Sequence, residues 1–82
     1  MFNIIFDKKA AVYFKKLDSE NKIRIGKKLE DLKNNPELGK PLTGNLSGLW
    51  SLRIGKYRLI YQIKNQELVI FILDLGHRKN VY

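Results

Sequence analysis

The chain has 82 residues, 44% of them hydrophobic, which suits one domain with a single core and argues against a disordered tail. Sixteen Lys and Arg residues against eight Asp and Glu give a formal charge of +8. This surplus favours a polyanionic partner, either nucleic acid or an acidic protein, over a merely solvated lysine-rich surface. The absence of cysteine excludes internal disulfides and thiolate metal sites and fits a reducing cytoplasm. With one histidine no structural zinc site is expected. With no apolar run near ~18 residues and no signal-peptide pattern, no membrane association is expected either.

The first half of the chain predicts one strand and then two helices. Residues 1–6 form a short apolar run with β-branched residues, typical of a strand. From Asp7 to Leu17 apolar residues recur at helical spacing. Asp18-Ser19 offers an N-cap for a second helix, which Asn34-Asn35-Pro36 ends. Because so few residues join the helices, they should form a helical hairpin.

The second half changes to a period of two. Residues 36–48 are rich in Gly and Pro and predict a loop. Alternating patterns at 50–54 and 57–63 predict two strands, and the continuous apolar run 68–73 predicts a third, ended by Gly76. The expected fold class is α+β in the order β-α-α-β-β-β. It is a single domain, residues 1–82, with a twisted antiparallel sheet packed against the N-terminal helical hairpin.

Two arginines flank the Gly55-Lys56 turn. In a two-residue hairpin loop, Arg53 lies directly opposite Arg58, so both guanidinium groups project from one face of the sheet. Like charges in that arrangement destabilise the sheet by some tenths of a kcal/mol unless an anion neutralises them. A phosphodiester would do so, because each guanidinium offers a planar fork of donors to phosphate oxygens. Two solvated side chains are the alternative interpretation.

The C-terminal stretch from Gly76 to Tyr82 reads GHRKNVY. There His77 could transfer a proton, Arg78 could offset phosphate charge and Tyr82 could stack on a base. A frayed polar terminus, or an aromatic that packs back onto the sheet, explains the same residues equally well. Trp50 falls on the apolar face of its strand and is expected in the core.

The run LRIGKYRLIYQI (residues 52–63), the apolar strand 68–73 and the closing GHRKNVY resemble the RelE/ParE superfamily of toxins from type II toxin–antitoxin pairs, in particular its RelE-like branch. The resemblance covers essentially the whole chain. It implies a ribosome-dependent mRNA endoribonuclease, or mRNA interferase, that cuts in the A site and thereby inhibits translation. It also implies metal-independent attack by the ribose 2′-oxygen on the adjacent phosphate, with no cofactor.

Carried over by position, the resemblance assigns roles to several residues. Arg58 matches the arginine that stabilises the phosphate, Arg78 the arginine near the leaving oxygen, and Tyr82 the tyrosine that stacks on the base. Arg53 matches a basic strand position and, with Lys56 at the turn, would bind substrate. The best-known branch carries lysines where this chain has Leu49 and Ser51.

Because this chain lacks those two lysines, the residue that accepts the proton is not assigned. Lys56 and His77 are the local candidates, and imidazole exchanges protons most readily near neutral pH. The resemblance further implies a hetero-oligomer with an acidic RelB-like antitoxin that covers the basic surface. The alternative function is a non-enzymatic ParE-like toxin that inhibits DNA gyrase through protein contacts. A third possibility is a degenerate member kept only as an antitoxin partner.

Overall fold

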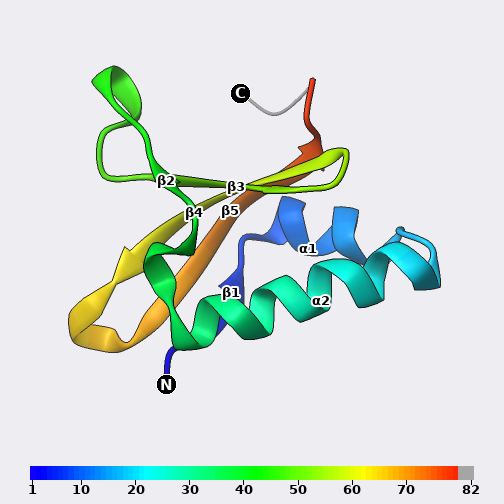
Figure 1. The fold of residues 1–82 in the computed structure, drawn as a ribbon, viewed down its shortest axis with the longest axis horizontal. Helices are drawn as coiled ribbons and strands as arrows, with labels where there is room; N and C mark the ends of the chain where they lie inside the picture. The colour runs from blue at the N-terminus through cyan, green and yellow to red at the C-terminus, as the bar shows by residue number, and fades with distance from the viewer. Residues whose placement is uncertain (80–82) are drawn as a thin grey trace.

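The computed structural model describes residues 1–79, and Figure 1 shows how the chain is arranged. The N-terminal part contains β1 (Asn3–Phe6), α1 (Lys8–Lys15) and α2 (Ser19–Asn34). The rest of the described chain adds β2 (Lys40–Pro41), β3 (Trp50–Ile54), β4 (Tyr57–Lys64) and β5 (Val69–His77). Short 3₁₀ turns occupy Pro36–Leu38, Gly44–Leu46 and Asn65–Glu67.

Both helices begin where the sequence predicts them to begin. The Asp7 carboxylate accepts a hydrogen bond from the Lys9 backbone N–H at 3.2 Å, and Asp18 caps α2 through the Asn21 N–H at 3.1 Å. The second helix stops one residue before Asn35 and two before Pro36. No helix within residues 1–79 is long and apolar enough to cross a bilayer.

The described strands form one sheet in the order β1-β5-β4-β3-β2. Four neighbouring strands run antiparallel, as predicted, but β1 pairs with β5 in parallel, with Asn3 opposite Val69. The prediction of an antiparallel sheet is therefore incomplete, because the sheet is mixed. The parallel pair brings together strands that are far apart in the chain, since both helices and the strands β2, β3 and β4 lie between β1 and β5 in the sequence.

The last strand differs from its prediction in length and register. It runs from Val69 to His77, so Gly76 lies inside the strand and does not end it. Between the pairs Tyr61–Ile72 and Ile60–Asp74 the register shifts by one residue, which leaves Leu73 as an extra residue on β5. This β-bulge exchanges the faces of all later residues of β5.

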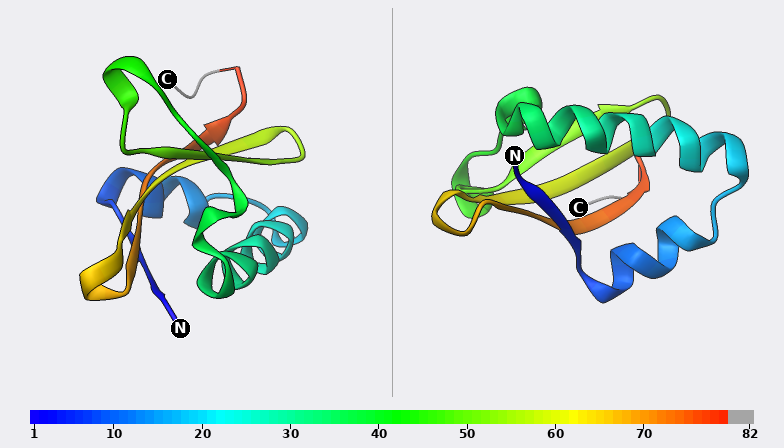
Figure 2. Two further views of the ribbon diagram at one scale, coloured as in Figure 1. Left: turned by 60° about the vertical axis from the view of Figure 1, so that its left-hand side comes forward. Right: turned by 90° about the horizontal axis from the view of Figure 1, so that it is seen from below.

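The core lies between the helices and one face of the sheet. The two helices diverge from their short connection, and both lie on the same side of the sheet (Figure 2). This helix-side face supplies most of the buried side chains, and α2 contributes Ile25 and Leu32. The largest fully buried side chains of the sheet are Tyr61, Leu59, Ile70 and Ile72. Trp50 packs against this cluster and stacks on Tyr61 with ring centroids 6.3 Å apart, as its position in the sequence predicts.

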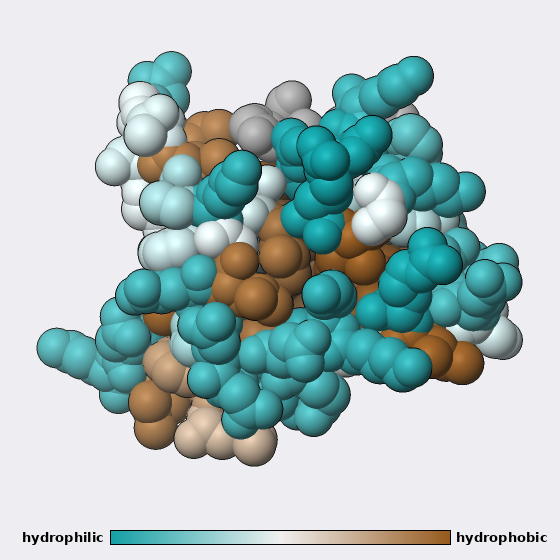
Figure 3. All heavy atoms as spheres, in the orientation of Figure 1, coloured by the Kyte–Doolittle hydropathy of each residue, from teal (hydrophilic) through white to brown (hydrophobic). Residues whose placement is uncertain are grey.

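Hydrophilic residues cover the outside of α2, whereas apolar atoms are exposed between α2 and β3 (Figure 3). The opposite face of the sheet, called the arginine face here, carries Arg53, Arg58 and the residues in register with them. The helices therefore occupy one side of the sheet and do not cover the arginine face.

Candidate active site

The Arg53–Arg58 pair sits at the tip of the β3–β4 hairpin. Ile54 pairs with Tyr57 and Arg53 with Arg58, which confirms the predicted two-residue loop and the shared face. Gly55 has a φ of +58°, and Lys56 has a negative φ, the pattern of a type II′ turn. Arg53 is exposed and Arg58 is half-buried, so solvent reaches the Arg58 side chain less than the Arg53 side chain.

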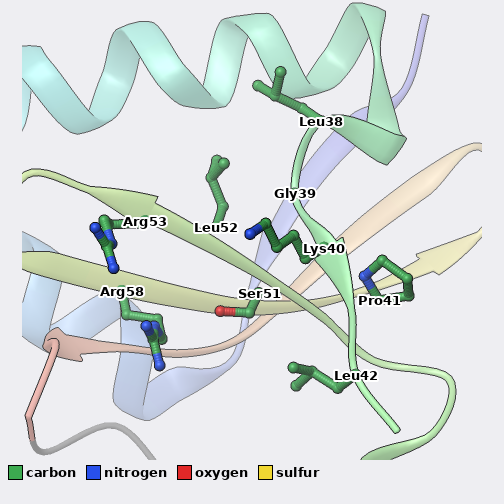
Figure 4. A pocket seen from close by; sticks show the side chains of 9 residues that line it. All are labelled: Leu38, Gly39, Lys40, Pro41, Leu42, Ser51, Leu52, Arg53 and Arg58. Carbon is green, nitrogen blue, oxygen red and sulfur yellow. The ribbon is translucent and has the colours of Figure 1, made fainter.

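A cavity of about 540 Å³ opens beside the two arginines. One wall is residues 38–42, called the crossing segment here, which contains β2 and passes β3. The other wall is formed by β3 and β4 (Figure 4). The cavity is lined by Leu38, Gly39, Lys40, Pro41, Leu42, Ser51, Leu52, Arg53 and Arg58. Three of these residues are cationic and none is acidic, so the cavity attracts an anion.

The crossing segment is held down by the side chain of Tyr61. The buried Tyr61 hydroxyl donates a hydrogen bond to the Pro36 carbonyl at 2.7 Å and accepts one from the Gly39 N–H at 3.0 Å. At Gly39 the backbone lies so close to β3 that an added Cβ would sit 2.5 Å from the Ser51 carbonyl oxygen. The wall of the cavity is therefore set by core contacts and by the lack of a side chain at residue 39.

The same tyrosine has a raised pKa. Burial raises the pKa of the Tyr61 hydroxyl above its usual value of 10.0. The hydrogen bond from Gly39 lowers the pKa, and the nearby Glu37 carboxylate raises it, so that the net shift is upward. The hydroxyl consequently stays protonated and remains a donor to Pro36 at physiological pH.

The structure does not bring His77 to the arginine face. His77 pairs with Tyr57, and its ring lies edge-on to the Tyr57 ring with centroids 6.5 Å apart, on the helix side of the sheet. Gly76 is the residue opposite Arg58. The bulge at Leu73 explains the change of face, because unbroken alternation from Ile72 would have placed residue 77 on the arginine side.

The other predicted residues lie at the same end of the sheet. The Arg78 N–H donates to the Lys56 carbonyl at 2.8 Å, which ties the chain after β5 to the hairpin turn. The Lys56 ammonium lies 5.8 Å from the centroid of the Tyr57 ring, within the range of a cation–π contact. Tyr82 lies outside the described residues.

Lys40 is the cavity residue that the sequence reasoning missed. It belongs to β2, a two-residue strand inside a segment that predicts only a loop. Two residues are too few to show alternation, so periodicity carries no signal there. The one local clue is that Lys40 follows Gly39, since a glycine can mark a close approach of two backbones.

A family model for the ParE toxin of type II toxin–antitoxin systems matches residues 4–82. The chain belongs to this toxin family. The resemblance to the RelE/ParE superfamily noted from the sequence is thereby confirmed, and so is the expected α+β fold.

Curated relatives of this type II toxin carry RelE-type names. Toxin RelG of Mycobacterium tuberculosis is 42% identical over 53 residues, which are 63% of this chain and 61% of that protein. The mRNA interferase toxin RelE of Escherichia coli is 28% identical over 76 residues, covering 90% of this chain and 80% of RelE.

Solved structures agree with this placement of the toxin. The toxin–antitoxin complex RelBE2 of M. tuberculosis contains a chain that matches with a TM-score of 0.84 and 32% identity, covering 94% of this chain and 98% of that one. The intact E. coli RelBE complex matches with a TM-score of 0.80 and 25% identity over 94% of this chain and 96% of its own.

Proposed function

We propose that this toxin is a ribosome-dependent endoribonuclease that cuts mRNA in the A site and so stops translation. The observation that carries the proposal is the Arg53–Arg58 pair on the edge of a cavity with no acidic residue in its lining. A relative named as an mRNA interferase, aligned over 90% of the chain, supports the same function.

In this proposal the arginine face grips the RNA backbone. Arg58, half-buried, donates to the oxygens of the scissile phosphate, and its fixed position favours the extra charge of the phosphorane-like transition state. Arg53, the exposed partner, binds the RNA beside it. The reaction needs no metal, because guanidinium groups offset the phosphate charge.

The remaining roles complete the cleavage reaction. A base removes the proton from the ribose 2′-OH, the 2′-oxygen attacks phosphorus, and the 5′-oxygen leaves with a proton. The products are a 2′,3′-cyclic phosphate and a 5′-hydroxyl. Arg78 assists the leaving oxygen, and Tyr82 stacks on the base. Lys56 at the hairpin turn transfers the proton, because the ring of His77 lies on the helix side of the sheet. His77→Ala and Lys56→Ala compared in one assay test this assignment.

The proposed partner in the resting cell is an acidic antitoxin of the RelB type. Two of the matching structures are complexes of RelE-type chains with their antitoxins, and the net charge of +8 suits an acidic ligand. Such an antitoxin would cover or distort the arginine face and keep RNA away.

The test is cleavage of mRNA on programmed ribosomes. The wild-type toxin should cut in the A site, and Arg58→Ala should lower the rate by about 10²-fold or more, because the variant loses charge stabilisation in the transition state. Lys27→Ala, which removes an exposed charge from α2, is the matched control and should cut at the wild-type rate. Full activity of Arg58→Ala would remove that residue from the mechanism.

A gyrase inhibitor is the second candidate, favoured by the family model, which is described for ParE toxins. It predicts inhibition of DNA supercoiling by the purified chain with no cut in ribosome-bound mRNA. The two assays on one preparation therefore separate the candidates.

A further inference from the structure

We propose that Lys40 is a third phosphate-binding side chain of the cavity, which contacts a phosphodiester next to the one held by the arginines. The inference rests on the proposed function, because its ligand is the RNA backbone bound at the same face. It adds a contact that neither the sequence pattern nor the assigned roles contain.

The strand register places Lys40 on the arginine face. On β2 and β3, Lys40 pairs with Ser51, and directly paired residues of antiparallel strands project to the same side. Ser51 is two residues from Arg53, a distance of about 7 Å along a strand. Lys40 therefore stands in the row of the sheet next to the Arg53–Arg58 row.

The side chain also points the right way. Figure 4 shows Lys40 extending from β2 toward the side of the cavity where Arg53 and Arg58 lie. An extended RNA backbone that crosses both rows would meet a cation in each. Lysine suits the outer position, because its ammonium is a compact charge on a flexible stem that follows a mobile phosphate.

The backbone under Lys40 is unusually well fixed for an exposed loop. The two Tyr61 hydrogen bonds hold the preceding residues, Pro36 and Gly39, and the pairing with Ser51 holds Lys40 itself. A charge carried on a fixed backbone loses less freedom when it binds.

No carboxylate within residues 1–79 pairs with the ammonium of Lys40. The Lys33–Glu30 ion pair on α2, 2.9 Å long, does not involve Lys40. No Asp or Glu is among the residues that line the cavity. Asp74 accepts a hydrogen bond from its neighbour, the Leu75 N–H, at 2.9 Å. Lys40 is therefore available to an anionic ligand.

The experiment measures binding of a short 2′-O-methyl oligoribonucleotide by fluorescence anisotropy over a series of KCl concentrations. This RNA lacks the 2′-OH and is not cut. For each phosphate contact to single-stranded RNA, the slope of log K against log[salt] changes by about 0.7. Lys40→Gln should lower the magnitude of the slope by that amount, whereas Lys40→Arg should keep the wild-type slope.

Lys27→Gln removes the same charge from α2, on the other side of the sheet, and should leave the slope unchanged. A wild-type slope for Lys40→Gln, or an equal loss in Lys27→Gln, would overturn the role of Lys40 while the nuclease proposal stands. If the wild-type toxin and Arg58→Ala bind this RNA equally weakly, with no salt dependence, the proposed function fails together with this inference.

Discussion

The hydroxyl of Tyr61 joins the core to the wall of the cavity. We expect Tyr61→Phe to lower the free energy of unfolding by about 1–3 kcal/mol, because the Pro36 carbonyl loses its donor and the Gly39 N–H loses its acceptor. Urea unfolding of both proteins, followed by tryptophan fluorescence of Trp50, measures the difference. A variant as stable as the wild type would mean that water replaces both hydrogen bonds.

The raised pKa of Tyr61 also predicts how stability depends on pH. The folded state holds the phenol proton more tightly than the unfolded state, so this contribution is complete below pH 10.0 and is lost as the pH rises from there toward the folded-state pKa. The wild-type protein should therefore lose stability above pH 10.0 more steeply than Tyr61→Phe. Equal slopes in urea titrations at alkaline pH would contradict this assignment.

Signals between residues close in the sequence predict several helix and strand boundaries correctly. Asp7 and Asp18 cap the helices, and the Gly55-Lys56 turn sets the hairpin register, because each depends on residues close together in the chain. The bulge at Leu73 could not be read, since it arises from the pairing of β5 with β4. For this reason the face on which His77 lies could not be predicted from the sequence.

Two glycines make a matched pair of substitutions that tests how tightly the crossing segment is held. Gly39→Ala would bring a Cβ to 2.5 Å from the Ser51 carbonyl oxygen, so the segment must move; we expect a loss of about 1–3 kcal/mol and weaker RNA binding. Gly26 lies inside α2, where an added Cβ would touch no neighbouring element within 4 Å. Gly26→Ala should therefore stabilise the protein by about 0.5–1 kcal/mol. Thermal unfolding of both variants provides the comparison.

An unfolding temperature for Gly39→Ala at or above that of the wild type would show that the segment can shift without cost. The gain expected for Gly26→Ala serves as the control for the general effect of adding a methyl group. Together the two variants separate backbone crowding from helix propensity.

Across the whole molecule, the charge of +8 governs encounter with the proposed acidic antitoxin. We expect the association rate to fall steeply as the salt concentration rises, while the dissociation rate changes much less, because steering acts before contact forms. Stopped-flow mixing at several salt concentrations measures both. An association rate independent of salt would show that the surplus charge serves another partner.

The overall architecture was predictable only in part. Its class and element order followed from periodicity, but the parallel pairing of β1 with β5 joins residues such as Asn3 and Val69, and no local pattern encodes such distant partners. The position of Lys40 was not predictable for a related reason, since β2 is held by its pairing with β3 and by the Tyr61 hydrogen bond to Gly39.

The parallel pair has a consequence for how this toxin is made. The first strand, β1, has its neighbour in the sheet only after β5 has been synthesised, so a nascent chain cannot complete this sheet before Val69–His77 have been added. Premature termination before Val69 would leave the hydrophobic underside of the helices uncovered, and such fragments would be targets for proteolysis. Intact product alone would then acquire the folded surface that carries the proposed site.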